Sequence, residues 1–141
     1  MSELPQPPVA DAVITELVVC TTCRPEGDSR EAPAAGATLF EAVQHAQFDL
    51  PAEALRRVRV RGQACMSACG RACTVALQAP GKPSYLFGDL QPDAATARDA
   101  LRCAAMHAEA ADGQLLRNQR PERLRNGILA KLPPHGAQAT G

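Results

Sequence analysis

The stretch Val13-Ile-Thr-Glu-Leu-Val-Val-Cys20-Thr-Thr-Cys23 joins a short run of β-forming residues directly to a pair of cysteines. Such a run, bounded by polar residues, is typical of a strand, so we expect a strand over residues 13–19 that ends at Cys20. The Cys20-x-x-Cys23 spacing then places two thiols immediately beyond the end of that strand. This combination predicts sulfur chemistry at one edge of a sheet.

A second group of cysteines lies further along the chain, at Cys65, Cys69 and Cys73. It follows the run Leu55–Arg61, in which valines alternate with arginines. That alternation favours a half-exposed strand, so these thiols also come after a strand. Each group can place two sulfurs on one soft metal ion without straining the chain, which makes the cysteines the most informative residues of the sequence.

Two further strands and two helices complete the predicted core. A helix opens at Gly36-Ala-Thr38, with Thr38 as its N-cap and Glu41 in the capping-box position three residues later. Residues 74–78 and 84–87 flank a Pro-Gly turn, which predicts an antiparallel hairpin.

A long Ala-rich helix begins at Pro92-Asp93 and runs to about Ala110. The element order is therefore β-α-β-β-β-α, and the first two strands, joined through a helix, should be parallel with a right-handed crossover. Thioredoxin-like folds share this order. We predict an α/β protein with a thioredoxin-like β-α-β-β-β-α core, a mixed four-stranded sheet and a C-terminal extension. Both cysteine groups would then emerge at one end of the sheet.

We divide the 141-residue chain into three parts. Residues 1–12 are a Pro-rich, flexible N-terminal arm, residues 13–112 form the domain, and residues 113–141 are a basic C-terminal extension. The basic residues of the extension, interleaved with leucines, are Arg117, Arg120, Arg123, Arg125 and Lys131. The extension would either pack its apolar side on the domain or offer a docking surface to an acidic partner.

The composition argues against several classes of protein. Fifteen basic and fifteen acidic residues give no formal net charge, so the chain as a whole has no attraction to nucleic acid or to a membrane. Three Phe, one Tyr and no Trp provide few surfaces on which bases could stack. The N-terminus does not resemble a signal peptide, and no run approaches the ~20 apolar residues of a membrane helix. We expect a cytoplasmic protein, in which clustered cysteines bind metal or react rather than form structural bridges.

The residues themselves leave three kinds of site open. A dithiol redox site at Cys20-x-x-Cys23 needs its first thiol at a helix N-terminus, whereas here a loop separates the pair from the helix. Four thiolates could also hold zinc in a tetrahedral site. A [2Fe–2S] cluster needs two pairs of thiolates, one pair for each iron, and the two groups provide them. We prefer the cluster, whose negative charge Arg24 and Arg71 would offset.

The order strand, cysteine, loop, helix, strand and Cys-x-x-x-Cys before a hairpin resembles the thioredoxin-like [2Fe–2S] ferredoxins over residues 13–110, and also the small iron–sulfur subunit of respiratory complex I. Four motifs more closely resemble an uncharacterised, DUF1636-like bacterial family of predicted metal-binding proteins, often encoded near cobalamin-biosynthesis genes. These motifs are Val-Cys-Thr-Thr-Cys-Arg (19–24), Cys-Met-Ser-Ala-Cys-Gly-Arg-Ala-Cys-Thr-Val-Ala-Leu (65–77), Leu-Phe-Gly-Asp-Leu (86–90) and Arg-Pro-Glu-Arg-Leu-Arg (120–125).

The resemblance implies a [2Fe–2S] cluster held by Cys20, Cys23, Cys65 and Cys69. The chain departs from the ferredoxin pattern in two respects. Only two residues separate its first two cysteines, and the ferredoxins have no equivalent of Cys73. Cys73 would therefore replace Cys69 or Cys23 as a metal ligand, or remain a spare thiol.

We therefore predict an iron–sulfur electron carrier for a redox partner protein, in cobalamin biosynthesis if the gene association of the family extends to this chain. The sequence has no catalytic triad, phosphate-binding loop or paired carboxylates, so we assign no catalytic residue and do not expect an enzyme in its own right. The resemblance to the ferredoxins implies a homodimer. The alternatives are a metal-handling protein that binds cobalt or zinc, and a thiol–disulfide redox protein.

Overall fold

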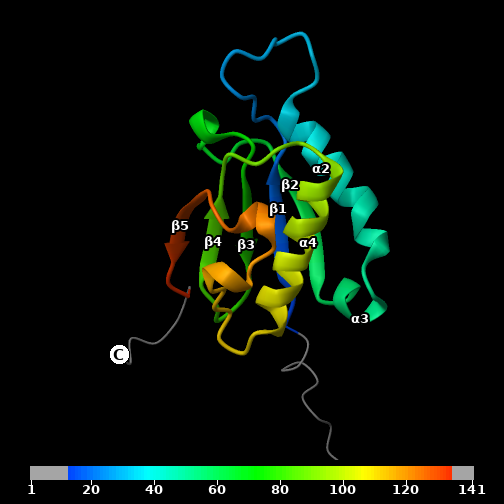
Figure 1. The fold of residues 1–141 in the computed structure, drawn as a ribbon, viewed down its shortest axis with the longest axis vertical. Helices are drawn as coiled ribbons and strands as arrows, with labels where there is room; N and C mark the ends of the chain where they lie inside the picture. The colour runs from blue at the N-terminus through cyan, green and yellow to red at the C-terminus, as the bar shows by residue number, and fades with distance from the viewer. Residues whose placement is uncertain (1–12, 135–141) are drawn as a thin grey trace, which may run out of the picture.

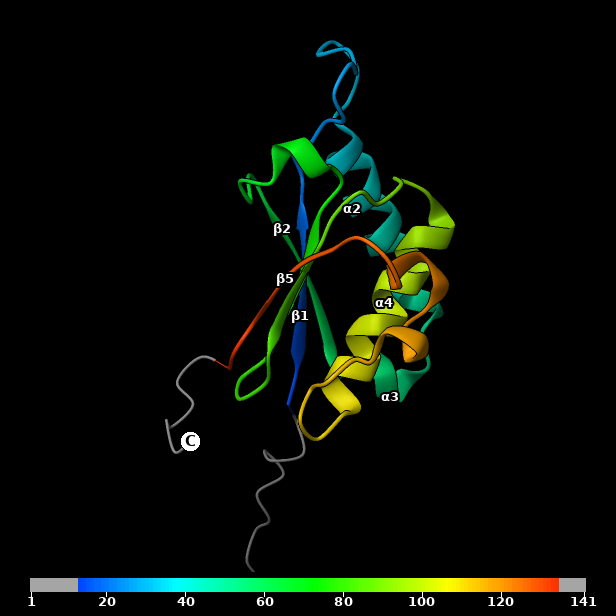
Figure 2. The same ribbon diagram turned by 60° about the vertical axis from the view of Figure 1, so that its left-hand side comes forward.

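A computed structural model describes residues 13–134, apart from the side chain of Cys69. Five strands form one mixed sheet in the order β2-β1-β3-β4-β5, and the helices cover one of its faces (Figures 1 and 2). The strands are β1 (Thr15–Cys20), β2 (Val58–Gln63), β3 (Val75–Gln78), β4 (Ser84–Phe87) and β5 (Ile128–Leu132). The α-helices are α2 (Ala35–Ala46), α3 (Ala52–Leu55) and α4 (Ala94–Glu109). Short 3₁₀ helices are η1 (Gln47–Asp49), η2 (Cys69–Arg71), η3 (Arg117–Gln119) and η4 (Glu122–Leu124).

Strand β1 is paired on both of its sides. It runs parallel to β2, with Cys20 beside Gln63, and antiparallel to β3, with Val19 beside Val75. Strands β3 and β4 form the predicted antiparallel hairpin. Because β1 and β2 are parallel, their C-terminal ends lie at the same edge of the sheet, and we call this edge the thiol rim.

The hydrophobic core lies between the sheet and the two long helices. Leu17 and Val19 of β1 are fully buried and point to this side, together with Leu77 of β3. Opposite them pack Leu39 and Val43 of α2 and Ala97, Ala100, Leu101 and Ala104 of α4. Burying side chains of this size stabilises the fold by roughly 1.5–3 kcal/mol each, so the end of β1 is held firmly against α2. In residues 13–134 no helix combines the length and apolar character that a bilayer crossing demands.

Helix α2 begins earlier than predicted. Its first residue is Ala35, Ala34 occupies the N-cap position, and no side chain caps the helix. The prediction of Thr38 as N-cap is wrong, since Thr38 lies inside the helix and its hydroxyl donates to the carbonyl of Ala34 at 3.4 Å. The N–H of Gly36 donates instead to the carbonyl of Cys23 at 2.9 Å, so the backbone of the cysteine turn satisfies part of the first helical turn.

Helix α4 is held at both ends. It begins as predicted at Asp93, whose carboxylate accepts a hydrogen bond from the N–H of Thr96 at 2.8 Å. At the other end the ammonium of Lys82, only 6% exposed, donates to the carbonyls of His107 at 2.9 Å and Ala108 at 2.7 Å. A cation at the negative end of a helix is favourable, which explains why a lysine is buried here.

The sheet has one strand more than predicted. Strand β5 pairs antiparallel with β4, placing Ala130 beside Leu86. Without β5, strand β4 would be the edge strand of the sheet, and one row of its backbone N–H and C=O groups would be unpaired. Residues 128–132 were predicted to belong to a C-terminal extension, because a single short strand after an irregular segment has little sequence pattern of its own.

The segment between α4 and β5 also packs on the domain. Leu115 is buried, and its N–H donates to the hydroxyl of Tyr85 at 3.0 Å. The buried guanidinium of Arg120 donates to the carbonyls of Leu115 at 3.3 Å and Arg125 at 3.0 Å, and it lies 5.6 Å from the centre of the Phe87 ring. At least one arginine of the predicted basic extension is therefore structural.

His107 of α4 is fully buried and uses both ring nitrogens. Nε2 lies 2.7 Å from the carbonyl oxygen of Pro83, and Nδ1 lies 2.8 Å from the hydroxyl of Thr15. Because the carbonyl can only accept, Nε2 carries the proton, and Nδ1 accepts from the hydroxyl. Burial lowers the pKa of His107 below its ordinary value, which keeps the ring neutral.

We expect the free energy of unfolding to fall as the pH drops below the ordinary histidine pKa of 6.5, because the unfolded chain then binds a proton that folded His107 excludes. The contribution is at most about 1.4 kcal/mol per pH unit. Urea unfolding near pH ~7.5 and pH ~5.5 measures it, and His107→Gln should lose less stability than the wild type between these pH values. Equal losses in both proteins would assign the pH dependence to other groups.

Candidate metal centre

The first cysteine pair lies in the turn that joins β1 to α2. Cys20 is 1% exposed and Cys23 is 2% exposed, and their Sγ atoms are 2.8 Å apart. This distance is longer than the roughly 2.05 Å of an S–S bond. The N–H of Cys20 donates to the carbonyl of Thr74 at 3.1 Å, and the Thr74 hydroxyl lies 3.5 Å from the sulfur of Cys23. The residue just before β3 therefore supports both members of the pair.

Gly36 allows α2 to pack directly on this turn. A Cβ atom at position 36 would lie 2.1 Å from the carbonyl oxygen of Cys20 and 3.0 Å from the nitrogen of Cys23. Contacts this short exclude any side chain. Glycine is thus needed at position 36 for close approach of the backbones, a requirement that the sequence pattern alone did not reveal.

The second cysteine segment, residues 64–73, follows β2 and packs beside the first pair. The hydroxyl of Thr22 donates to the carbonyl of Ala64. The N–H of Thr21 donates to the carbonyl of Gln63 at 2.9 Å, and the backbone of Met66 lowers the pKa of the Cys20 thiol. The two groups of cysteines, which are far apart in the sequence, therefore meet at the thiol rim.

The cysteines of the second segment differ in their surroundings. Cys65 is exposed, and its sulfur accepts a hydrogen bond from the N–H of Ser67 at 3.4 Å. The backbone of Cys69 begins η2, while its side chain lies outside the described part of the structure. Ser67 has a φ of 57°, a left-handed conformation that shapes the turn between these two cysteines.

Cys73 and Cys103 belong to the hydrophobic core. Both are fully buried, and burial raises the pKa of each thiol to about 12. For Cys73 the neighbouring sulfurs of Cys23 and Cys20 add to this effect. The backbone of Cys73 is tied to Leu90 by two hydrogen bonds of 3.1 Å. Both residues thus carry neutral thiols in an apolar setting.

Cys20 behaves differently from these core thiols. Burial opposes its ionisation, but the hydrogen bond from Cys23 and those from the backbone of Thr22 and Met66 outweigh burial and lower its pKa. The thiolate is the form of cysteine that binds metals and attacks disulfides. Cys20 is therefore chemically competent for either role.

The two arginines expected to offset a cluster's charge both have other partners. One guanidinium nitrogen of Arg24 donates to the carbonyls of Ser29 at 2.8 Å and Ala32 at 2.6 Å, so this side chain organises the loop after Cys23. Arg71 forms an ion pair with Asp89, which already balances its charge. The charge of Arg71 is therefore balanced by Asp89, whereas Arg24 keeps its net positive charge but is anchored to the loop after Cys23.

The donors fit a soft metal in kind and in location. Two sulfurs bound to one tetrahedral ion at ~2.3 Å lie about 3.8 Å apart. The sulfurs of Cys20 and Cys23 are 2.8 Å apart, so they would need to separate by about 1 Å. Among the side chains that the structure describes, which do not include that of Cys69, no three His, Cys, Asp or Glu residues are already grouped as a metal site. The rim therefore holds suitable ligands that are not in a finished arrangement.

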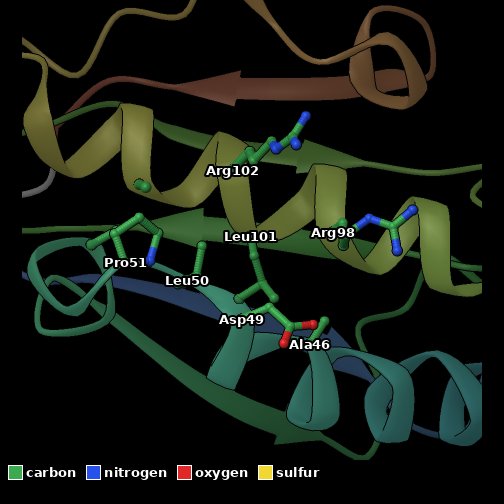
Figure 3. A pocket seen from close by; sticks show the side chains of 9 residues that line it. Ala46, Asp49, Leu50, Pro51, Arg98, Leu101 and Arg102 are labelled. Atoms are coloured by element: carbon green, nitrogen blue, oxygen red, sulfur yellow. The ribbon is translucent and has the colours of Figure 1, made fainter.

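A groove of about 380 Å³ lies elsewhere on the surface, between α4 and the segment that follows α2. Its lining residues are Ala46, Asp49, Leu50, Pro51, Ala54, Arg98, Leu101, Arg102 and Ala105. In Figure 3, Leu101 points into the space between the helices, whereas the side chains of Arg98 and Arg102 extend in different directions. Ligand sites usually have a few polar groups that converge on one point. Because the polar groups of this groove do not, and because it lies at the end of α2 remote from Cys23, the thiol rim is the better candidate.

The arrangement of the sheet and helices is found in proteins of known structure. The chain is similar to the thioredoxin-like [2Fe–2S] ferredoxin of Aquifex aeolicus, in one structure with a TM-score of 0.50 and 19% identity over 83% of this chain and 97% of that one. A second structure of such a ferredoxin from the same organism gives a TM-score of 0.47 and 20% identity over 89% and 98% of the two chains. The first likeness confirms the predicted thioredoxin-like fold.

The family of the chain follows from its sequence. Residues 17–134 match the family model described as "Protein of unknown function (DUF1636)", and the chain belongs to this family. The resemblance seen in the sequence motifs is thereby confirmed. No protein with a curated description matches the chain.

We expect Gly36→Ala to lower the free energy of unfolding by about 1–3 kcal/mol, because the added methyl group would overlap the carbonyl of Cys20. Urea unfolding monitored by circular dichroism measures this change. Gly70→Ala is the matched control, since a Cβ there meets nothing within 4 Å, and it should change stability by no more than about 0.5 kcal/mol. Equal losses in the two variants would contradict the close contact of α2 with the cysteine turn.

Proposed function

We propose that this protein holds a [2Fe–2S] cluster at the thiol rim and passes single electrons to a partner protein. One observation carries the proposal: two distant thiol-bearing segments meet at one edge of the sheet. The contacts of Thr22 with Ala64 and of Met66 with Cys20 join them. Thiolates in two pairs are what such a cluster requires, and a thioredoxin-like fold is compatible with this role.

Cys20 and Cys23 would bind one iron, and Cys65 and Cys69 the other. The short distance of 2.8 Å between the first two sulfurs supports their action as a pair. The segment that carries Cys65 and Cys69 lies directly beside them. Cys73 belongs to the hydrophobic core cluster, which includes neither Cys20 nor Cys23, and this supports a packing role for the fifth thiol rather than a ligand role.

A bound cluster would supply one-electron chemistry, and its potential would depend on the hydrogen bonds and charges around it. This chain directs a backbone N–H group at one of the proposed ligands, since Ser67 donates to the sulfur of Cys65 at 3.4 Å. The backbone of Met66 in addition lowers the pKa of Cys20. Hydrogen bonds to sulfur favour the more negatively charged reduced form and therefore raise the reduction potential.

The exposed position of Cys65 supports electron exchange with another protein on this side of the rim. The identity of the redox partner, the homodimer, the cytoplasmic location and the role in cobalamin biosynthesis all stay predictions from the sequence and its resemblances. The buried position of Arg120 within the domain weakens the prediction that the arginines of residues 113–134 bind an acidic partner.

The second candidate is a thiol–disulfide redox protein. The contact between the sulfurs of Cys20 and Cys23 and the lowered pKa of Cys20 favour it. However, residues 24–34 separate Cys23 from the start of α2 at Ala35, whereas dithiol proteins of this kind begin the helix directly at their attacking cysteine; here the first turn of α2 meets the backbone of the pair, where the N–H of Gly36 donates to the carbonyl of Cys23. We therefore rank this candidate below the cluster.

Anaerobic purification distinguishes these functions. We expect a coloured protein with two iron atoms and two acid-labile sulfides per chain, as a [2Fe–2S] cluster demands. The measurements are the visible absorption spectrum and chemical analysis of iron and sulfide. A colourless protein with stoichiometric zinc or cobalt would support the metal-handling alternative. A metal-free protein in which Cys20 and Cys23 cycle with a dithiol reductant would support the redox alternative.

The ligand set is tested by single substitutions. Replacing Cys20, Cys23, Cys65 or Cys69 by Ser should remove most of the iron, because each replacement leaves one iron with a single strong protein ligand. Cys73→Ala and Cys103→Ala form a matched pair of controls, since both residues are fully buried in the core, and both should keep the cluster. Loss of iron in Cys73→Ala but not in Cys103→Ala would show that Cys73 is a ligand.

A further inference from the structure

The connection between β4 and α4 binds the second cysteine segment at its C-terminal end. Asp89 has a φ of 59°, a left-handed conformation that Asp and Asn tolerate better than most residues. Its N–H donates to the carbonyl of Arg71 at 2.7 Å. Its two carboxylate oxygens each accept from Nε of Arg71 at 3.0 Å, and one also accepts from Nη2. A single residue thus holds both the backbone and the side chain of Arg71.

Gly88 lies between this contact and the C-terminal part of the domain. A Cβ atom at Gly88 would lie 2.7 Å from Cδ1 of Leu129, 2.8 Å from the carbonyl oxygen of Arg71 and 3.1 Å from Cβ of Arg71. The N–H of Gly88 also donates to the carbonyl of Gly127 at 2.8 Å. Strand β5 and the turn before it therefore support the connection from the other side.

The N-terminal end of the same cysteine segment contacts the first cysteine pair. The hydroxyl of Thr22, which lies between Cys20 and Cys23, donates to the carbonyl of Ala64, and Cys20 is 1% exposed although it lies at the edge of the sheet. Cys65, in contrast, is exposed. The segment is thus tied to the turn of the first cysteine pair at its start and to Asp89, through Arg71, near its end.

We propose that Arg71 and Asp89 are positioning residues that hold the second cysteine segment over Cys20, with Gly88 and Leu129 supporting them from β4 and β5. What the thiols are held in place for rests on the proposed function. The positioning of the segment by Arg71 and Asp89 does not depend on whether a cluster binds. Release of the segment would uncover Cys20 and Cys23, and with a bound cluster it would speed loss of the metal. The motif Leu-Phe-Gly-Asp-Leu (86–90), which contains Gly88 and Asp89, would then serve to position the second cysteine segment.

The expected effect is local, because an ion pair with 52% and 49% exposed side chains contributes little to global stability. Asp89→Asn keeps the size and the left-handed preference of the side chain and removes its charge. We expect alkylation of Cys20 in the full chain, both as purified and after removal of metal under reducing conditions, to become about two- to fivefold faster. Mass spectrometry reports the rate at each cysteine. Cys103, buried in the core, should keep its slow rate, which shows that the whole domain has not loosened.

The control for this variant is Glu16→Gln. It breaks the ion pairs of Glu16 with Arg61, at an N–O distance of 3.1 Å, and with Arg59, at 3.9 Å, and Glu16 lies toward the start of β1, away from the rim. It should leave the alkylation rate of Cys20 unchanged. Salt provides a second readout that simple destabilisation would not move. In about 1 M NaCl the wild type should approach the rate of Asp89→Asn, while the variant itself should not change.

Gly88→Ala tests the same contact without altering a charge, since the added methyl group would push against Arg71 and Leu129. It should also speed alkylation of Cys20, and this effect should persist in high salt. Unchanged rates at Cys20 in both folded variants would overturn the positioning role, whether or not the protein binds a cluster. Faster alkylation in a protein that never acquires iron and sulfide would keep the positioning role and reject the proposed function.

Discussion

The parallel pairing of β1 with β2 is the constraint on which the rest of the site depends. With Cys20 beside Gln63, the residues that follow both strands leave the sheet at the same edge. An antiparallel pair would send the second cysteine segment to the opposite end of the domain. Parallel pairing requires a crossover element, and α2 supplies it by packing its first turn on the backbone of Cys20 and Cys23. The absence of a side chain at Gly36 is therefore part of how the thiols are brought together.

The five thiols of the two cysteine groups are not equivalent, and depth explains why. Cys65 is exposed, Cys20 and Cys23 are buried at the edge of the sheet, and Cys73 belongs to the hydrophobic core cluster. A thiol in an apolar setting stays protonated, because the thiolate cannot be solvated there. The pKa of a thiol at the edge of the sheet can be lowered by backbone groups, as that of Cys20 is by Met66. The surroundings thus differ among thiols that lie only three or four residues apart within each cysteine group.

Much of the fold could be predicted because it depends on local patterns. The alternation of valine and arginine in β2, the Pro-Gly turn of the hairpin and the Asp93 cap of α4 each leave a clear sequence signature. The features that were missed depend on contacts between distant segments. The start of α2 is set by the carbonyl of Cys23, and the partner of Arg71 lies beyond the hairpin. Neither contact can be inferred from residue spacing, and β5 is recognisable as a strand only once β4 offers it an edge.

The C-terminal part of the domain makes the connection between fold and site closer than the ferredoxin-like core alone would suggest. Arg120 is buried, with its guanidinium bonded to two backbone carbonyls and one nitrogen, Nε, without a hydrogen-bond partner in the described structure. Burying a charged guanidinium that has no carboxylate partner costs free energy. Hydrogen bonds to backbone carbonyls offset this cost only if the segment that carries those carbonyls is held in place. That segment leads through Gly127 into β5, whose Leu129 supports Gly88 and, through it, Arg71. Two of the sequence stretches on which the resemblance was based, residues 86–90 and 120–125, thus lie on one continuous path of contacts that ends at the second cysteine segment. On this argument the C-terminal part of the domain supports the thiol rim, and Arg120 contributes to it by packing inside the domain.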